Sequence, residues 1–170
     1  VFMFPGQGSQ YVNMGRDLCD SEPVFKQHFD CCCELFTKEF GTDLKAIIFP
    51  KAGEEEKAAE QLKQTIYTQA SLFTMHYSLA KLWMHWGITP DAMMGHSIGE
   101  FAAACLAGVF SLEDAVKLVA NRGRMMQELP GGSMLSVRAA EEDVVKKLPA
   151  GCSIACSGVR CTTSGSGRPC

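Results

Sequence analysis

The chain has 170 residues and a net charge of −3, and it carries no cluster of Lys and Arg, which excludes a general nucleic-acid binder. An apolar fraction of 46% and a charged fraction of 21% are ordinary for one globular domain with a real core. Because no apolar stretch is long enough to cross a bilayer and no signal peptide is recognisable, we expect a cytoplasmic protein without a membrane partner.

The first third of the chain predicts one strand, one glycine-rich loop and one long helix. Val1–Phe4 has the pattern of a buried strand and runs into the loop of residues 5–10. A helix is predicted over Pro23–Phe40, with Ser21 as its N-cap and the proline in its first turn. The charged stretch of residues 53–57 indicates a solvated segment that opens a short helix.

A second long helix is predicted from Tyr67 to Trp86, where Gly87 ends it and Pro90 blocks its return. Apolar residues recur along it at the spacing of a helix face that meets a core. The predicted core-facing stripe comprises Ala70, Phe73, Tyr77, Ala80, Leu82 and Trp83.

The rest of the chain again alternates strands and helices. Asp91–Met94 is predicted as a strand, and a helix follows it. Ser111 and the acidic residues after it approach a capping box that opens a helix to Glu128. The remaining predicted elements are a strand at Ser133–Val137, a helix at Ala140–Leu148 and a strand at Cys152–Ala155. This alternation predicts an α/β fold with a mainly parallel sheet.

Gly95 to Gly99 read Gly-His-Ser-Ile-Gly, a serine between two glycines at the junction of a predicted strand and a predicted helix. That context is the one that a nucleophile elbow requires, because the glycines permit a sharp bend that lifts the Ser97 hydroxyl above the sheet. The alternative is a glycine-capped turn with a bystander serine. Ser97 needs a general base, and His96 is not given that role, because adjacent side chains usually diverge.

Nine cysteines, an odd number, with no secretory leader favour reduced thiols over a disulfide framework. Four of them near the C-terminus could be imagined as zinc ligands, namely Cys152, Cys156, Cys161 and Cys170. Their spacings lack the repeated short Cys pairs of zinc sites, so we predict no metal.

Three segments together resemble the acyltransferase family that loads extender units in polyketide and fatty-acid synthesis, in the style of a modular type I polyketide synthase. They are residues 4–10, residues 95–100 and Arg122 with its neighbours, in the family's order and at about its spacing. The resemblance implies an α/β-hydrolase-like core over residues 1–130, with a parallel sheet. It also implies the start of a ferredoxin-like small subdomain over residues 131–155. Residues 156–170 lack periodicity and are predicted as a disordered tail foreign to the family.

The resemblance also implies roles for individual residues. Ser97 would attack the thioester of malonyl-CoA and pass the acyl group to the phosphopantetheine thiol of an acyl carrier protein. The backbone N–H groups of Gln7 and Ile98 would form the oxyanion hole. Arg122 would pair with the free malonyl carboxylate, with Gln69 and His96 beside the substrate. Taken without the resemblance, Arg122 is equally well a solvated helix residue, and Gln69 a surface amide.

The resemblance implies malonyl rather than methylmalonyl as the extender unit, from the hexapeptide of residues 64–69 and from the isoleucine after Ser97. No bound cofactor is implied, and ketosynthase-type neighbouring domains are expected as partners. In the family the general-base histidine lies well downstream of the serine. Here the histidines are His28, His76, His85 and His96, all upstream of Ser97.

We therefore expect an N-terminal fragment of the domain whose C-terminal part is missing and which is inactive alone, with a tail produced by a shifted reading frame. Two other functions stay open: a serine hydrolase that passes the acyl group to water, and a non-catalytic interaction module.

Overall fold

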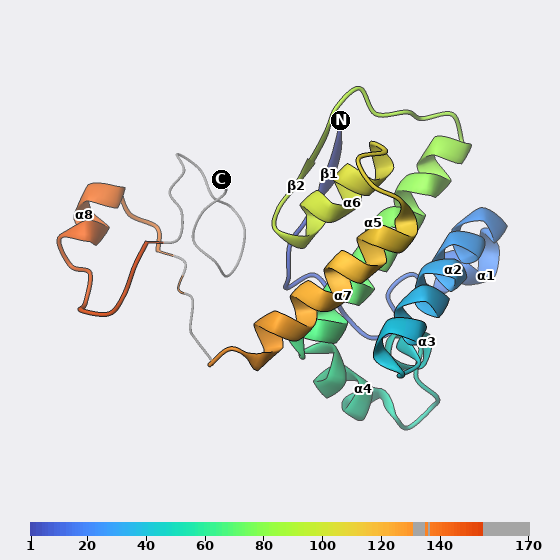
Figure 1. The fold of residues 1–170 in the computed structure, drawn as a ribbon, viewed down its shortest axis with the longest axis horizontal. Helices are drawn as coiled ribbons and strands as arrows, with labels where there is room; N and C mark the ends of the chain where they lie inside the picture. Colours follow the sequence, from blue (N-terminus) through green and yellow to red (C-terminus); the bar gives the residue numbers. More distant parts are fainter. Residues whose placement is uncertain (131–134, 136, 155–170) are drawn as a thin grey trace. The chain divides into compact units, whose positions relative to one another are not determined.

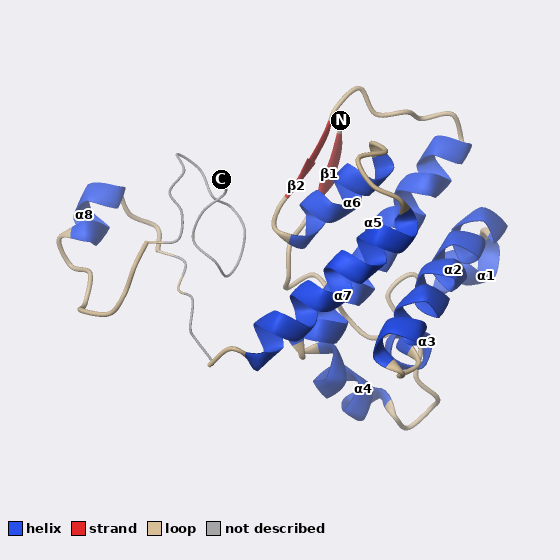
Figure 2. Ribbon diagram, in the orientation of Figure 1, coloured by secondary structure: helices blue, strands red, loops and turns tan. Residues whose placement is uncertain are grey.

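Two short parallel strands lie beside a group of helices in the N-terminal part of the chain (Figures 1 and 2). Strand β1 spans Phe2–Phe4 and strand β2 spans Met93–Gly95, with Phe2 opposite Met93 and Phe4 opposite Gly95. The predicted parallel pairing is confirmed, although β2 lies one to two residues further along the chain than expected. Because the two strands are far apart in sequence, their pairing brings the glycine-rich loop next to the serine segment.

The computed structural model describes residues 1–130, 135 and 137–154. The chain divides into two units, Val1–Leu129 and Pro130–Cys170. Within the first unit the helices after β1 are α1 (Arg16–Ser21), α2 (Pro23–Phe40), α3 (Leu44–Ile48), α4 (Glu55–Leu62), α5 (Thr65–His85), α6 (Ile98–Leu106) and α7 (Leu112–Glu128).

Helices α1 and α3 are absent from the sequence prediction because six and five residues are too few to show a helical period. The prediction that Ser21 caps α2 is wrong: Ser21 is the last residue of α1, where its hydroxyl donates to the Asp17 carbonyl at 2.8 Å. Glu22 takes the cap position in an extended conformation, and Pro23 opens α2 as expected. The predicted short acidic helix is confirmed as α4.

The core lies where α2, α5 and α7 pack on one another. Phe25, Phe29 and Phe36 of α2 are fully buried, and Phe36 meets Phe73 of α5 edge-on with ring centroids 5.9 Å apart. Helix α5 is buried at every position from 68 to 74, so it passes through the core and does not present one stripe. The prediction that places Trp83 in that stripe is wrong, since Trp83 is 40% exposed.

Helix α7 positions the residues that matter most below. Ser111 caps it as predicted, since its hydroxyl oxygen accepts from the Asp114 N–H at 3.1 Å. A Cβ at Gly123 would lie 2.9 Å from the Ile66 Cα, so α7 and α5 approach one another closely at this point. The glycine at position 123 therefore fixes how deep the neighbouring Arg122 sits.

In the second unit, the described residues form one helix, α8 (Glu141–Val145), shorter than the predicted Ala140–Leu148. Residues 152–154 of the predicted strand Cys152–Ala155 are irregular, and Ala155 lies outside the described residues. Most of the predicted strand Ser133–Val137 and the whole predicted tail also lie outside them. Among the described residues, no helix is long and apolar enough to cross a membrane.

Candidate active site

Ser97 occupies a strained turn between β2 and α6. Its φ of 54° and ψ of −111° are values that a non-glycine residue rarely adopts, and such strain is concentrated at functional sites. The Ser97 side chain is half-buried, and the next residue begins α6. The order of strand, sharp turn and helix is thus present, and the serine stands at the bend as a nucleophile elbow requires.

The two glycines around Ser97 are needed because backbone approaches them. A Cβ on Gly95 would lie 2.2 Å from the Glu100 nitrogen, and a Cβ on Gly99 would lie 2.2 Å from the Phe4 carbonyl oxygen. The same Phe4 oxygen accepts the His96 N–H at 2.9 Å. The turn is therefore clamped against the end of β1, which a bystander serine in a simple turn would not require.

Arg122 meets Ser97 directly. Its Nη2 donates to the Ser97 Oγ at 3.0 Å, although 25 positions separate the two residues. The guanidinium carbon lies 5.6 Å from the centre of the Phe101 ring, which covers one side of it. Burial lowers the pKa of Arg122 from its usual value, and nearby Glu100 opposes that shift. Its Nη1 is buried and has no partner among the described residues, so it can receive an anionic oxygen.

The glycine-rich loop of residues 5–10 lies against the turn at His96. Gly6 is buried under His96, since a Cβ there would come within 2.3 Å of the His96 Nδ1. Neither the Gln7 N–H nor the Ile98 N–H donates to another described residue. Both predicted oxyanion donors are therefore free to bind a substrate oxygen, and the Ile98 N–H is also the first of helix α6.

Gln69 is fully buried in α5, so the alternative of a surface amide is wrong. Its Nε2 donates to the Gln7 Oε1 at 3.1 Å and lies 3.3 Å from the Met126 Sδ of α7. Its Oε1 has no partner among the described residues. The structure thus brings Gln69 to the loop of Gln7, and Arg122 to Ser97. The sequence prediction misses Met126 and Phe101, although Met126 stands one helical turn after Arg122.

His28, His76 and His85 lie in α2 and α5, as expected of structural residues. His76 is buried against Phe4, with ring centroids 5.6 Å apart, and burial lowers its pKa to about 4. No group of three or more potential metal ligands occurs within the part of the chain that the structure describes. Three of the four cysteines weighed as zinc ligands fall outside that part.

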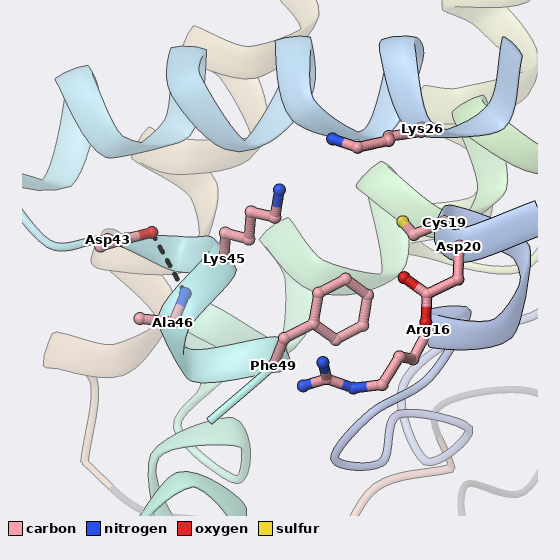
Figure 3. Close-up of a pocket in the computed structure, with 8 residues that line it drawn as sticks. All are labelled: Arg16, Cys19, Asp20, Lys26, Asp43, Lys45, Ala46 and Phe49. Carbon is pink, nitrogen blue, oxygen red and sulfur yellow. Dashed lines mark hydrogen bonds between the residues drawn. The ribbon is translucent and has the colours of Figure 1, made fainter. Parts of the chain in front are cut away.

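A separate depression of about 350 Å³ lies between α1, α2 and α3 (Figure 3). The depression is lined by Arg16, Cys19, Asp20, Lys26, Asp43, Lys45, Ala46 and Phe49. None of these is a predicted site residue. Both of its lysines bind the single carboxylate of Asp30, at 2.5 and 2.6 Å, and neither contacts Ser97 or Arg122. This depression is therefore no part of the site around Ser97.

The fold is that of an α/β protein with a strained serine on a strand-to-helix turn. The chain belongs to the acyl transferase domain family, whose model matches residues 1–168. The match includes most of residues 156–170 and so gives no support to the prediction of a tail foreign to the family, which stays untested.

Similar proteins are components of polyketide synthases. The chain is 46% identical to one component of the phenolphthiocerol/phthiocerol polyketide synthase of Mycobacterium tuberculosis, covering 88% of this chain and 10% of the relative. It is 45% identical to the spectinabilin polyketide synthase system protein NorB of Streptomyces orinoci, covering 85% of this chain and 7% of that protein. The chain thus spans about a tenth or less of these curated relatives.

Solved structures agree on the fold. The acyl transferase domain of ZmaA is 46% identical with a TM-score of 0.79, covering 85% of this chain and 33% of that one. An acyl carrier protein S-malonyltransferase from Vibrio cholerae is 36% identical with a TM-score of 0.64, covering 78% of this chain and 40% of that one. The predicted fold class is confirmed by these matches.

Proposed function

We propose that this chain supplies the nucleophile and the substrate carboxylate receptor of an acyltransferase that moves malonyl from coenzyme A to an acyl carrier protein. The hydrogen bond between Arg122 and Ser97 carries the proposal, because it sets a guanidinium next to a strained serine on a nucleophile elbow. The names of two similar structures point the same way: one is an acyl carrier protein S-malonyltransferase, and one was solved with a substituted malonyl group.

In the proposed first step the Ser97 Oγ attacks the thioester carbonyl, its proton passes to a general base, and the carbonyl oxygen becomes an oxyanion. The free N–H groups of Gln7 and Ile98 would stabilise that oxyanion. The carbon–sulfur bond then breaks, coenzyme A leaves as its thiol, and malonyl stays on Ser97 as an ester. In the second step the phosphopantetheine thiol of the carrier protein attacks the ester and releases Ser97.

Arg122 would hold the far carboxylate of the malonyl group. A guanidinium binds a carboxylate through two parallel N–H bonds, and Arg122 has one donor on Ser97 and a second, buried donor without a partner among the described residues. An acetyl group has no carboxylate and would leave that second donor unpaired. The residue therefore favours a diacid over a monoacyl group.

The preference for malonyl over methylmalonyl rests on the resemblance of residues 64–69 and of Ile98 to malonyl-type domains. Ile98 is fully buried at the start of α6, and Gln69 is buried beside Gln7. Rates of transfer for the two extender units, measured side by side, test this preference, and faster transfer of methylmalonyl would contradict it.

The resemblance to the family implies a general-base histidine downstream of Ser97, whereas all four histidines of this chain lie at or before position 96. Further partners of the proposed enzyme are the carrier protein and neighbouring synthase domains such as a ketosynthase. Like the cytoplasmic location, they remain predictions. The 170-residue chain alone is expected to acquire no malonyl group.

The test uses a hybrid domain in which residues 1–129 replace the matching part of the ZmaA acyl transferase domain. Incubation with labelled malonyl-CoA should give one malonyl group on Ser97, located by mass spectrometry, and none on the Ser97→Ala variant. Adding a carrier protein should move the label to its phosphopantetheine thiol. Release of the label to water at the same rate with and without carrier protein would support a hydrolase instead. A folded hybrid domain that acquires no label would contradict the proposal.

A further inference from the structure

One side-chain pair fastens the glycine-rich loop to the core of the first unit. Gln69 Nε2 donates to Gln7 Oε1 at 3.1 Å across 62 positions of sequence. Among the residues that the structure describes, this is the only hydrogen bond that joins residues 6–10 to a distant part of the chain. The loop's other hydrogen bonds are local, from Gly8 N–H to Gln10 Oε1 and from Ser9 Oγ to the Gly6 carbonyl.

The two partners differ in how firmly they are held. Gln69 is completely buried within the stretch of α5 that crosses the core, whereas Gln7 lies in an exposed loop. The Gln69 Nε2 also contacts the Met126 Sδ at 3.3 Å, one helical turn from Arg122. A rigid amide thus ties the loop of Gln7 to the helix that presents Arg122.

The remaining oxygen of Gln69 argues against a role in binding a diacid. Within the described part of the chain, Gln69 Oε1 is buried without a partner, and so is Arg122 Nη1. An ionised carboxylate offers only acceptors, so it satisfies the arginine donor and leaves the glutamine oxygen as it is. A buried amide with one unpaired oxygen lowers stability relative to an apolar residue of the same shape. Stability therefore gives no reason for glutamine at position 69, and the bond to Gln7 gives one.

We propose that Gln69 is a positioning residue that holds the Gln7 backbone N–H at the oxyanion, and that it does not bind substrate. This inference rests on the proposed function and assigns Gln69 a different role from the substrate contact implied by resemblance. Loss of the bond between Gln69 and Gln7 leaves the loop with local hydrogen bonds only. The Gln7 donor then moves, and misplacement by about 1 Å is enough to slow a reaction by up to a hundredfold.

The kinetic signature separates the two roles. An oxyanion forms only on the way to the transition state, so a misplaced donor lowers kcat and kcat/KM together and leaves KM unchanged. Loss of a substrate contact would instead raise KM. Gln7→Ala is informative because it removes the side-chain acceptor and keeps the backbone N–H.

The experiment compares Gln69→Leu, Gln7→Ala and the double variant in the hybrid domain, with release of free coenzyme A from malonyl-CoA as the rate. Gln127→Leu is the matched control: the Gln127 Oε1 accepts from the Thr65 N–H at 2.7 Å, so it also joins α7 to α5 but does not touch the loop. Thermal melts of every variant check that the fold is kept, and Gln69→Leu is expected to melt no lower than the parent.

Each single variant should lose about tenfold to a hundredfold in kcat with KM unchanged, and the double variant should lose no more than either single one, because all three break the same bond. The control should keep the parent rate. A raised KM for Gln69→Leu, an unchanged rate for Gln7→Ala, or losses that multiply in the double variant would overturn the inference. If the parent hybrid folds but is not acylated on Ser97, the proposed function fails and this inference fails with it; if only the Gln69 pattern is absent, the proposed function stands.

Discussion

Replacing Arg122 by alanine should abolish the preference of the enzyme for malonyl-CoA, which carries a free carboxylate, over acetyl-CoA, which does not. The side chain offers two nitrogens: Nη2, which lies 3.0 Å from the Ser97 Oγ, and Nη1, which is buried with no partner among the described residues. A malonyl carboxylate that accepts from both forms two charge-assisted hydrogen bonds. Such bonds contribute about 1.5–3 kcal/mol each, so we expect a loss of about 3–6 kcal/mol in Arg122→Ala.

That loss corresponds to roughly two to four powers of ten in kcat/KM for malonyl-CoA. For acetyl-CoA the same change should alter kcat/KM by less than about threefold or raise it, because no carboxylate is lost and an unpaired buried donor is removed. Arg122→Lys keeps the charge without the planar fork, so its malonyl rate should fall between those of the parent and the alanine variant.

The assay measures release of coenzyme A from both thioesters by the hybrid domain. Arg124→Ala is the matched control, since the Arg124 side chain lies on the same helix but is exposed and binds Asn121 and the Glu39 carbonyl. The control should leave both rates within about twofold of the parent, as expected for exposed surface pairs. An equal fall for malonyl and acetyl in Arg122→Ala would show that the arginine serves Ser97 alone, and would refute the carboxylate assignment.

The packing of the first unit leads to three more predictions. Gly99→Ala should destabilise the hybrid domain by at least about 1–3 kcal/mol in urea unfolding, because its Cβ would lie 2.2 Å from the Phe4 carbonyl oxygen; an unchanged midpoint would contradict the clamp. Burial lowers the pKa of His76 to about 4, so the unfolded state binds the extra proton first as the pH falls below 6.5. Relative to His76→Leu, the parent should therefore lose up to about 3 kcal/mol of stability between pH 6.5 and pH 4. The measurement is the free energy of unfolding against pH, and parallel curves for the two proteins would contradict the prediction. Burial also raises the pKa of the Cys32 thiol well above its usual value, so alkylation at neutral pH should label exposed Cys31 first, and prior labelling of Cys32 by mass spectrometry would oppose this.

The elbow could be predicted from sequence because its signal is local. Two glycines two positions either side of Ser97, between an apolar run and a helical run, leave few conformations open to the backbone. The structure adds what sequence does not contain, namely that the Gly99 position is closed by the Phe4 carbonyl of a strand more than 90 positions away. Contacts between residues so far apart in sequence depend on the fold. The sequence therefore predicts the bend at Ser97 but not the contact of the Phe4 carbonyl with Gly99.

The short helices and the role of Gln69 could not be predicted for a different reason. Helix α3 has five residues, and its best local signal, Asp43 accepting from the Ala46 N–H at 3.1 Å, is a single cap. Gln69 looks like a surface amide in a sequence because amides usually are exposed. Only the crossing of α5 through the core buries it, and that crossing depends on α2 and α7 packing against α5.

The described glycines that do not adopt positive φ share one property: each lies in close contact with another part of the chain. A Cβ on Gly6, Gly95, Gly99 or Gly123 would come within 3.0 Å of another part of the chain, whereas most glycines with positive φ face open space. Three of the four contact glycines flank Ser97 and the loop of Gln7, and the fourth lies next to Arg122. The parts of the proposed site are therefore set by backbone lying directly on backbone or on a packed ring. The contacts of Gly95, Gly99 and Gly123 are with backbone and cannot give way by rotation of a side chain, so the backbone of the Ser97 turn and of α7 beside α5 should move little on substrate binding.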